Sequence, residues 1–298
     1  MNYHMLGRSS LSVSEIGFGC MSLEDTEQAN ILLLNQALDR GINYFDTADI
    51  YQNGLNEKTL GKAFLTRRHE MIIASKAGNV LRKVGSGLDW NASKKHILFA
   101  VSESLRRLQT DYIDLYQLHG GTMDDPIDET IEAFEILQKQ GKIRYYGISS
   151  IRPTVINEYV RRSNIVSVMM QYGLLDRRPE ETCLPLLQQH SIGVLARGSL
   201  AKGLLVNKPP KSFLDYSEHE VKKAAAVVKM VSGPQRSASQ TTIQFALANR
   251  AIASAVVGIR TLQQLEEAVE TANTPQLTTN EFKTLSGCLP VNYYDQHR

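Results

Sequence analysis

The sequence predicts an α/β fold, a (β/α)8 TIM barrel with a short N-terminal β-hairpin. Short apolar, β-prone runs alternate eight times with longer stretches of helical periodicity, which is typical of parallel strands joined by right-handed crossover helices. A polar residue or a glycine ends each run, as expected at the functional rim of such a barrel. The length of 298 residues suits one barrel, so we expect a single domain over residues 1–298.

The expected elements follow one another along the chain. Residues 3–13 alternate loosely around a turn at 7–10 and form the predicted hairpin. We expect strands at residues 16–19, 44–46, 71–75, 112–118, 143–148, 166–170, 192–196 and 255–258. We expect helices at residues 27–40, after Asn56, at 93–108, at 127–140, from Pro153, and at 180–190, 218–231, 238–249 and 261–272.

Spacing and end signals justify these assignments. In the first helix, apolar residues from Ile31 to Leu38 recur on one face, and Gly41 follows the end. Ser93 is an N-cap residue in front of an amphipathic repeat. Pro153 begins another helix at the position where a missing N–H costs least.

Composition and charge argue against several classes of protein. The formal net charge is +2 and the short arginine pairs are far apart, so the concentrated basic field of a nucleic-acid binder is missing. Cys20, Cys183 and Cys288 form no CxxC pair, which indicates a reducing compartment and no thiolate metal site. The start of the chain lacks the apolar core of a signal peptide, and no apolar run has the length of a membrane span. We expect a cytoplasmic protein that binds no nucleic acid, membrane or metal.

Polar side chains lie where the expected strands end. They are Asp46, Lys76, His119, Ser149, Gln171 and Arg197, with Gly258 after the eighth strand. Chemistry in a (β/α)8 barrel sits at the carboxyl ends of the strands, so these residues predict a polar ring around one mouth. Taken singly, each has a commoner explanation as a turn residue, a surface charge or a structural histidine. Their joint position at one rim favours an active site.

Asp46, Tyr51, Lys76 and His119 together suit proton transfer to a carbonyl oxygen. A phenol has an ordinary pKa of about 10, and we expect a neighbouring ammonium to lower it by stabilising the tyrosinate. An acid beside the lysine keeps the ammonium charged and in place. A histidine beside the phenol can orient a carbonyl group or relay a proton. The set supplies no hydride, so reduction of a C=O group would need a nicotinamide cofactor.

Ordered motifs carry a family resemblance. They are GINYFDTADIY, Lys76 in IIASKAG, DYIDLYQLH, GKIRYYGISS, MMQYGLL and LAKGLL. From about residue 6 to 272 the chain resembles the aldo-keto reductases, and among them the bacterial members that share a branch with potassium-channel β-subunits. The resemblance implies a barrel that reduces aldehydes and ketones with NADPH and without a metal. It implies Tyr51 as the general acid, tuned by Lys76 and Asp46, while His119 orients the carbonyl.

The resemblance also implies a cofactor site. Its residues would be Gly19, Cys20, Met21, Ser149, Gln171, Arg197, Gly198, Leu200, Gly203, Gly258, Arg260, Gln264 and Glu267. No GxGxxG follows a strand, so a Rossmann site is not supported. Ser149 and Gln171 would hold the carboxamide, and Arg197 stands where the family usually stacks a tyrosine on the nicotinamide. Arg260 and Gln264 would contact the adenosine 2′-phosphate, which favours NADPH over NADH.

Two other functions stay open on the sequence. A nicotinamide-binding redox sensor or interaction module with little turnover would keep the same four polar residues. A barrel lyase or aldolase would use Lys76 as a Schiff-base lysine, but Asp46 and Tyr51 beside it fit proton relay better.

The substrate is expected to be a small-molecule carbonyl compound whose identity depends on loops. These are residues 79–89 with Trp90, residues 207–217, and the tail around Tyr293 and Tyr294. The 207–217 loop is short for a strap over a cofactor, so we expect easy exchange of NADPH. The resemblance implies a monomer.

Overall fold

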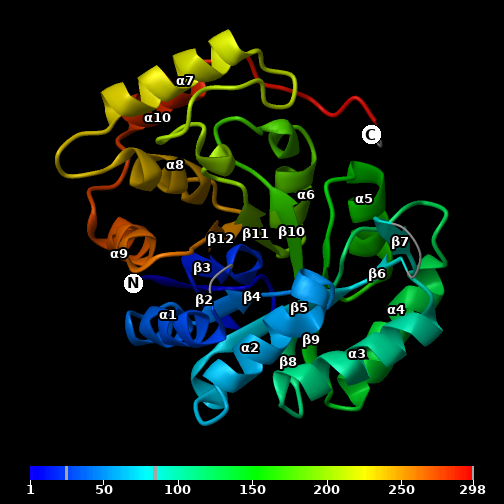
Figure 1. The fold of residues 1–298 in the computed structure, drawn as a ribbon. Helices are drawn as coiled ribbons and strands as arrows, with labels where there is room; N and C mark the ends of the chain where they lie inside the picture. Colours follow the sequence, from blue (N-terminus) through cyan, green and yellow to red (C-terminus); the bar gives the residue numbers. More distant parts are fainter. Residues whose placement is uncertain (24–25, 83–85, 297–298) are drawn as a thin grey trace.

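Eight parallel strands close into a barrel in the computed structural model, which describes residues 1–23, 26–82 and 86–296 (Figure 1). In order around the barrel they are β3 (Ile16–Gly19), β4 (Tyr44–Asp46), β5 (Ile72–Ala77), β8 (Ile113–Leu118), β9 (Ile143–Ser149), β10 (Ser167–Gln171), β11 (Gly193–Arg197) and β12 (Ile252–Gly258), and β12 pairs with β3 to close the ring. β1 (Tyr3–Met5) and β2 (Ser12–Ser14) form an antiparallel hairpin. The predicted barrel and its N-terminal hairpin are therefore confirmed.

Helices connect the strands and surround the barrel. They are α1 (Glu27–Asp39), α2 (Leu55–Ala63), α3 (Lys94–Leu108), α4 (Ile127–Lys139), α5 (Pro153–Arg162), α6 (Cys183–Gln189), α7 (Glu218–Val231), α8 (Ala238–Leu247), α9 (Leu262–Glu270) and α10 (Thr279–Ser286). The Ser93 side chain accepts a hydrogen bond from the His96 backbone N–H, as its predicted capping role requires. No helix among the described residues is long and apolar enough to cross a membrane.

Three parts of the fold differ from the sequence prediction. The expected loop at 79–89 contains a second hairpin, β6 (Asn79–Leu81) and β7 (Leu88–Trp90), and its residues 83–85 lie outside the described part of the chain. β12 begins at Ile252, three residues earlier than predicted. Small residues such as Ser254 interrupt its apolar pattern, so the sequence indicates only the second half of the strand. α10 was not predicted, and a capping box between Thr278 and Glu281 begins it.

Alternation along the strands separates two cores and aims the polar residues inward. Tyr44 belongs to the apolar cluster inside the barrel, whereas Phe45 belongs to the cluster between the strands and the helices. The two-residue period therefore returns Asp46 to the inner side. In the same way Ala74 lies in the inner cluster, so Lys76 points into the barrel.

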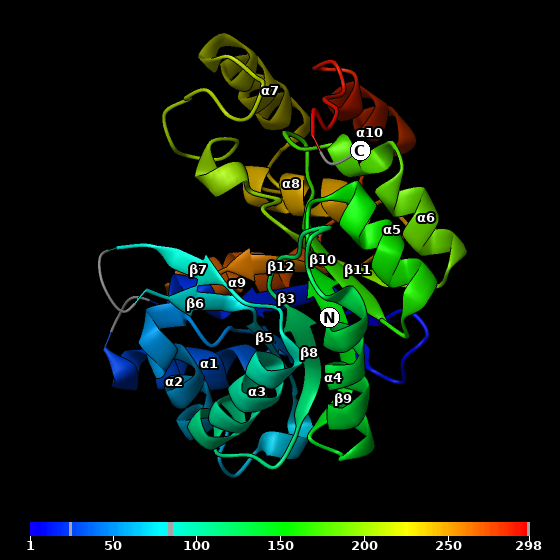
Figure 2. The same ribbon diagram turned by 90° about the vertical axis from the view of Figure 1, so that its right-hand side faces the viewer.

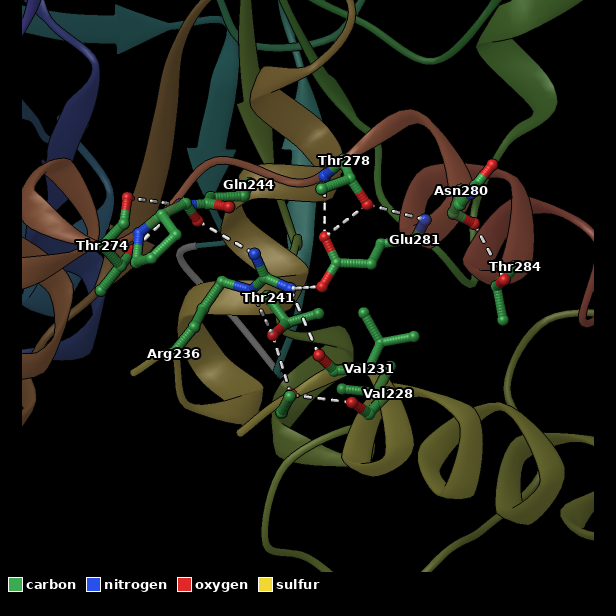
Figure 3. A network of polar contacts seen from close by, with 12 residues as sticks. Val228, Val231, Arg236, Thr241, Gln244, Thr274, Thr278, Asn280, Glu281 and Thr284 are labelled. Atoms are coloured by element: carbon green, nitrogen blue, oxygen red, sulfur yellow. Dashed lines mark hydrogen bonds and ion pairs between the residues drawn. The ribbon is translucent and has the colours of Figure 1, made fainter. Parts of the chain in front are cut away.

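α7 and α10 lie side by side outside α8 (Figures 1 and 2). Arg236 joins these helices, since its guanidinium donates to Glu281 Oε1 at 2.5 Å, to the Pro275 carbonyl oxygen at 2.9 Å and to the Val231 carbonyl oxygen at 3.2 Å (Figure 3). The next residue, Ser237, caps α8. This network attaches the C-terminal helix to the element that begins beside the barrel mouth.

Candidate active site

A cavity of about 1510 Å³ occupies the barrel mouth at the carboxyl ends of the strands. Residues predicted to form the site line it: Asp46, Tyr51, Lys76, His119, Gly19, Met21, Ser149, Gln171, Arg197, Gly198, Leu200, Gly203, Gly258, Arg260, Gln264 and Glu267. The volume is larger than a typical small-ligand pocket of about 300–1,000 Å³, so it has room for a dinucleotide and a small substrate together.

Neighbouring strands bring the three charged or ionisable residues together. Asp46 ends β4, Lys76 is the penultimate residue of β5, and His119 directly follows β8. These strands are consecutive in the barrel, although β5 and β8 are separated in sequence by a hairpin and a helix. Parallel pairing therefore places the three residues at one side of the mouth.

Lys76 and Asp46 form a buried ion pair. The Lys76 Nζ donates to Asp46 Oδ1 at 2.5 Å and to the Thr47 carbonyl oxygen at 2.8 Å. Burial alone would lower the pKa of Lys76, but the charge of Asp46, together with the hydrogen bonds to Asp46 and Tyr51, raises it above its usual value. Burial also raises the pKa of Asp46, and the ammonium opposes this shift. Lys76 therefore remains an ammonium group inside the barrel.

Tyr51 lies on a tightly held turn after β4. Its hydroxyl is 3.5 Å from the Lys76 Nζ, and the ammonium lies 5.1 Å from the centre of its ring. Gln52 and Asn53, which follow, have left-handed backbones with φ of 49° and 56°. Gln52 Nε2 holds the turn by donating to the Leu23 carbonyl oxygen at 2.5 Å. The strained backbone is stabilised by these contacts, and it aims the phenol at the lysine.

The pKa of Tyr51 moves in the opposite direction to the sequence expectation. Burial raises this pKa above its usual value, and the lowering effect of Lys76 is smaller. The lysine is visible in the sequence, but the desolvation that outweighs its charge depends on the burial of the phenol in the fold. The phenol thus stays protonated at neutral pH, which is the form that a general acid needs.

His119 is a neutral imidazole next to the phenol. Its ring lies edge-on to that of Tyr51, with centroids 5.9 Å apart. Burial, with the charges of Lys76 and Arg197, lowers the pKa of His119 to about 3. Within the described residues no group hydrogen-bonds to the imidazole, and its Nδ1 is buried without a partner. The ring lines the cavity, so a ligand there would bond to its other nitrogen, Nε2.

The opposite side of the mouth carries the predicted cofactor residues. Arg197 Nη1 donates to Gln171 Oε1 at 2.9 Å, so these two strand-end residues form one polar surface. The Arg260 backbone N–H donates to Gln264 Oε1 at 2.9 Å, at the start of α9. Glu267 accepts from Ser237 Oγ at 2.6 Å. This arrangement places amide, guanidinium and carboxylate groups along the wall from β10 to α9.

Several polar residues of the cavity wall are absent from the predicted site residues. They are Ser22, Thr122, Ser150, Arg152, Ser199, Lys202, Lys208 and Ser239. Of these, Lys208 belongs to the 207–217 loop, which the sequence predicts to wall the substrate pocket. The two lysines in the segment after β11 are a signal that was present, because phosphate groups attract clustered cations. Ser22 and Ser239 gave no signal, since only the closed barrel brings them to the mouth.

Trp90 forms a fixed wall of the cavity near His119. Its indole N–H donates to Asp125 Oδ1 at 2.6 Å. A Cβ at Gly78 or Gly120 would lie 2.7 Å or 3.0 Å from the indole ring, so only glycine allows the ring to pack there. The prediction that Trp90 walls the pocket agrees with this position.

Cys20, unlike the other predicted cofactor residues, does not line the cavity. Its side chain is fully buried in the main core and its thiol contacts the Phe18 carbonyl oxygen at 3.8 Å. The short helix η1 (Cys20–Ser22) turns this residue inward and Met21 outward. The described residues also hold no cluster of three or more His, Cys, Asp or Glu placed to bind a metal ion.

The fold and the cavity define a barrel enzyme with its polar site at the strand ends. The model of the Aldo/keto reductase family matches residues 15–290, and the chain belongs to this family of oxidoreductases.

Known relatives match the whole chain or nearly all of it. An uncharacterized oxidoreductase of Bacillus subtilis, YqkF, is 49% identical over 100% of both chains. The L-galactose dehydrogenase of Arabidopsis thaliana is 30% identical over 94% of this chain and 91% of its own. The solved aldo-keto reductase AKR11C1 from Bacillus halodurans, in its holo form, is 48% identical with a TM-score of 0.94, over 100% of this chain and 99% of its own.

Proposed function

We propose that the chain reduces aldehydes and ketones to alcohols with NADPH, and that Tyr51 is the general acid. The observation that carries this proposal is the buried chain of contacts from Asp46 to the Lys76 ammonium at 2.5 Å and on to the Tyr51 hydroxyl at 3.5 Å. The neutral ring of His119 lies beside the phenol.

The donor set of the cavity fits a nicotinamide dinucleotide. Ser149 and Gln171 would hold the carboxamide, and Arg197 would lie against the ring. Arg260 and Gln264, at the N-terminus of α9, would hold the 2′-phosphate, since helix N-termini and guanidinium groups favour anions. When bound, the reduced nicotinamide supplies the hydride that the chain itself lacks.

The residues of the chain then handle one proton. The Tyr51 O–H donates its proton to the carbonyl oxygen as the carbonyl carbon accepts the hydride. The Lys76 ammonium stabilises the tyrosinate that remains, and Asp46 with the Thr47 carbonyl oxygen keeps the ammonium in place. His119 donates an N–H to the carbonyl oxygen and fixes its direction. The tyrosinate takes a proton back from water after the alcohol leaves.

The test is consumption of NADPH, followed by absorbance, with a panel of aromatic and aliphatic aldehydes and α-dicarbonyls. In Tyr51→Phe the turnover should fall by about 10²–10⁴-fold, the usual contribution of a general acid, while NADPH binding persists. Tyr3→Phe is the control, because it removes an exposed hydroxyl in the N-terminal hairpin. Wild-type turnover in Tyr51→Phe would refute the mechanism. Tight NADPH binding without turnover on any carbonyl would favour a redox sensor instead.

A further inference from the structure

We propose that the substrate class is a carbonyl compound that carries a carboxylate, and that Arg152 binds this carboxylate. The inference rests on the proposed reductase function and names the substrate class of the same cavity. It depends on the partners of Arg152, on its place in the barrel and on the wall between it and His119.

Arg152 is the residue directly before α5, and its side chain lines the cavity. Its Nη1 donates to the Gly121 carbonyl oxygen, and its backbone N–H donates to Ser150 Oγ at 3.2 Å. A guanidinium has five N–H donors, and its side chain uses one of them here. Across the described residues no carboxylate pairs with this half-buried guanidinium, although it lines the cavity. It therefore has donors and charge left for a ligand.

Arg178, which lines the same cavity, differs from Arg152 because a carboxylate of the protein pairs with it. Arg178 donates to both oxygens of Asp176, each at 2.8 Å, and its guanidinium lies 4.7 Å from the centre of the Tyr294 ring. Its charge is thus neutralised within the protein. A partly buried cation without a counter-charge is costly, and an anionic ligand lowers that cost. Arg197, at the end of β11, also lacks a carboxylate partner among the described residues, but it donates to Gln171, whereas Arg152 follows β9, the strand next to β8.

The barrel places Arg152 away from the expected phosphates. β9, which precedes Arg152, lies between β8 and β10 and is opposite β3 in the ring of eight strands. Arg260 and Gln264 follow β12, the neighbour of β3. The cofactor phosphates would therefore lie across the mouth from Arg152. β9 is paired on one side with β8, and His119 directly follows β8. Arg152 and His119 therefore follow neighbouring strands.

The surroundings of Arg152 define the shape of such a substrate. Trp90 packs on Gly120, which lies between His119 and the carbonyl group that Arg152 contacts. An apolar or aromatic spacer between the carbonyl and the carboxylate would lie against this indole. No side chain caps the N-terminus of α5. The partial positive charge of this helix end therefore adds to the positive potential of Arg152. A planar guanidinium binds a carboxylate through two parallel hydrogen bonds.

The test compares matched pairs of aldehydes. The kcat/KM values are measured for 4-formylbenzoate and its methyl ester, and for succinic semialdehyde and butanal, in the wild type, Arg152→Gln and Arg152→Lys. The ratio of acid to neutral substrate should fall by about 10–100-fold in Arg152→Gln, mainly through KM, and only partly in Arg152→Lys. Arg161→Gln is the matched control, because it removes the same charge from the exposed face of α5 and should leave the ratio unchanged.

An unchanged ratio of acid to neutral substrate in Arg152→Gln overturns the inference. If both substrates lose kcat/KM equally, Arg152 only holds the loop at Gly121, and if neither loses any, Arg152 contacts no substrate. If the wild type reduces no aldehyde at all, the proposed function fails, and the inference is then judged by binding of benzoate and benzamide to the complex with NADP+. Equal affinities there, or affinities that Arg152→Gln leaves unchanged, would also overturn it.

Discussion

Lys76 and Asp46 form an ion pair of 2.5 Å in which the two side chains are only 1% and 7% exposed. The ammonium also lies 3.5 Å from the Tyr51 hydroxyl. Removing one partner of a buried pair leaves an uncompensated charge, whereas removing both does not. The stability of the barrel mouth and the reactivity of the phenol therefore depend on the same contact.

Lys76→Met should lower both stability and turnover. The variant leaves Asp46 buried without its cation, so the free energy of unfolding should fall by about 3–5 kcal/mol in urea titrations. Adding Asp46→Asn to this variant should restore part of the stability, since an amide carries no charge, but should not restore turnover. Equal stabilities of the single and double variants would contradict the buried pair.

His119 should not titrate in the working range of the enzyme. Its pKa of about 3 keeps the imidazole neutral, so kcat/KM should show no inflection from this group between about pH 5 and 8. His119→Gln keeps a neutral N–H donor, and its pH profile should match that of the wild type at a lower rate. An inflection near about pH 6.5 that disappears in His119→Gln would mean that the ring is charged.

Ionisation of the Asp49 carboxyl should lower the free energy of unfolding of the protein as the pH rises. Burial and the charge of Glu57 raise its pKa to about 7, and its Oδ1 has no hydrogen-bond partner among the described residues. Because the folded state holds the proton more tightly than the unfolded state, the protein loses stability between about pH 4 and 7. Asp49→Asn removes this dependence. The melting temperature of this variant should exceed that of the wild type by several degrees at about pH 8, and by less at about pH 5.

Arg260→Gln should reduce the preference for NADPH over NADH. Loss of a cation at the 2′-phosphate should raise KM for NADPH by about 10–100-fold and leave KM for NADH nearly unchanged. Arg250→Gln is a matched control, since Arg250 precedes β12 and Arg260 follows it, at opposite ends of one strand. Similar changes in both variants would indicate a general loss of positive charge rather than a specific contact.

Arg236→Met should weaken the attachment of α10. Loss of the bonds to Glu281 and to the Pro275 carbonyl oxygen should lower the free energy of unfolding by about 2–3 kcal/mol. NADPH affinity should fall as well, because the adjacent Ser237 holds Glu267 in the cavity wall. Arg67→Met, which breaks surface ion pairs to Asp39 and Glu70, should lower the free energy of unfolding far less. Equal losses would show that burial of Arg236 has no effect.

Much of the site could be anticipated because its residues occupy strand ends. Apolar runs are followed by polar residues, among them Asp46, Lys76 and His119. In a (β/α)8 barrel the carboxyl ends of all strands lie at one rim, so these residues are expected there. The burial of the Cys20 side chain could not be predicted, since the inward turn of η1 depends on packing with the core. Arg152 gave no signal in the sequence, because its importance depends on which carboxylates lie near it. The single domain, the monomeric state and the easy exchange of NADPH stay predictions.

The sequence by itself determined the fold class and the chemical types at the mouth. Both follow from local patterns: the alternation of two periodicities, and the polar residue that ends each apolar run. The tertiary structure alone decided the contact between Lys76 and Asp46 and the buried state that raises the pKa of Tyr51. It also decided that, among the described residues, the Arg152 guanidinium contacts the Gly121 carbonyl oxygen and no carboxylate. Desolvation and ion pairing depend on what surrounds a group in space, and closure of the barrel brings those surroundings together from distant parts of the chain.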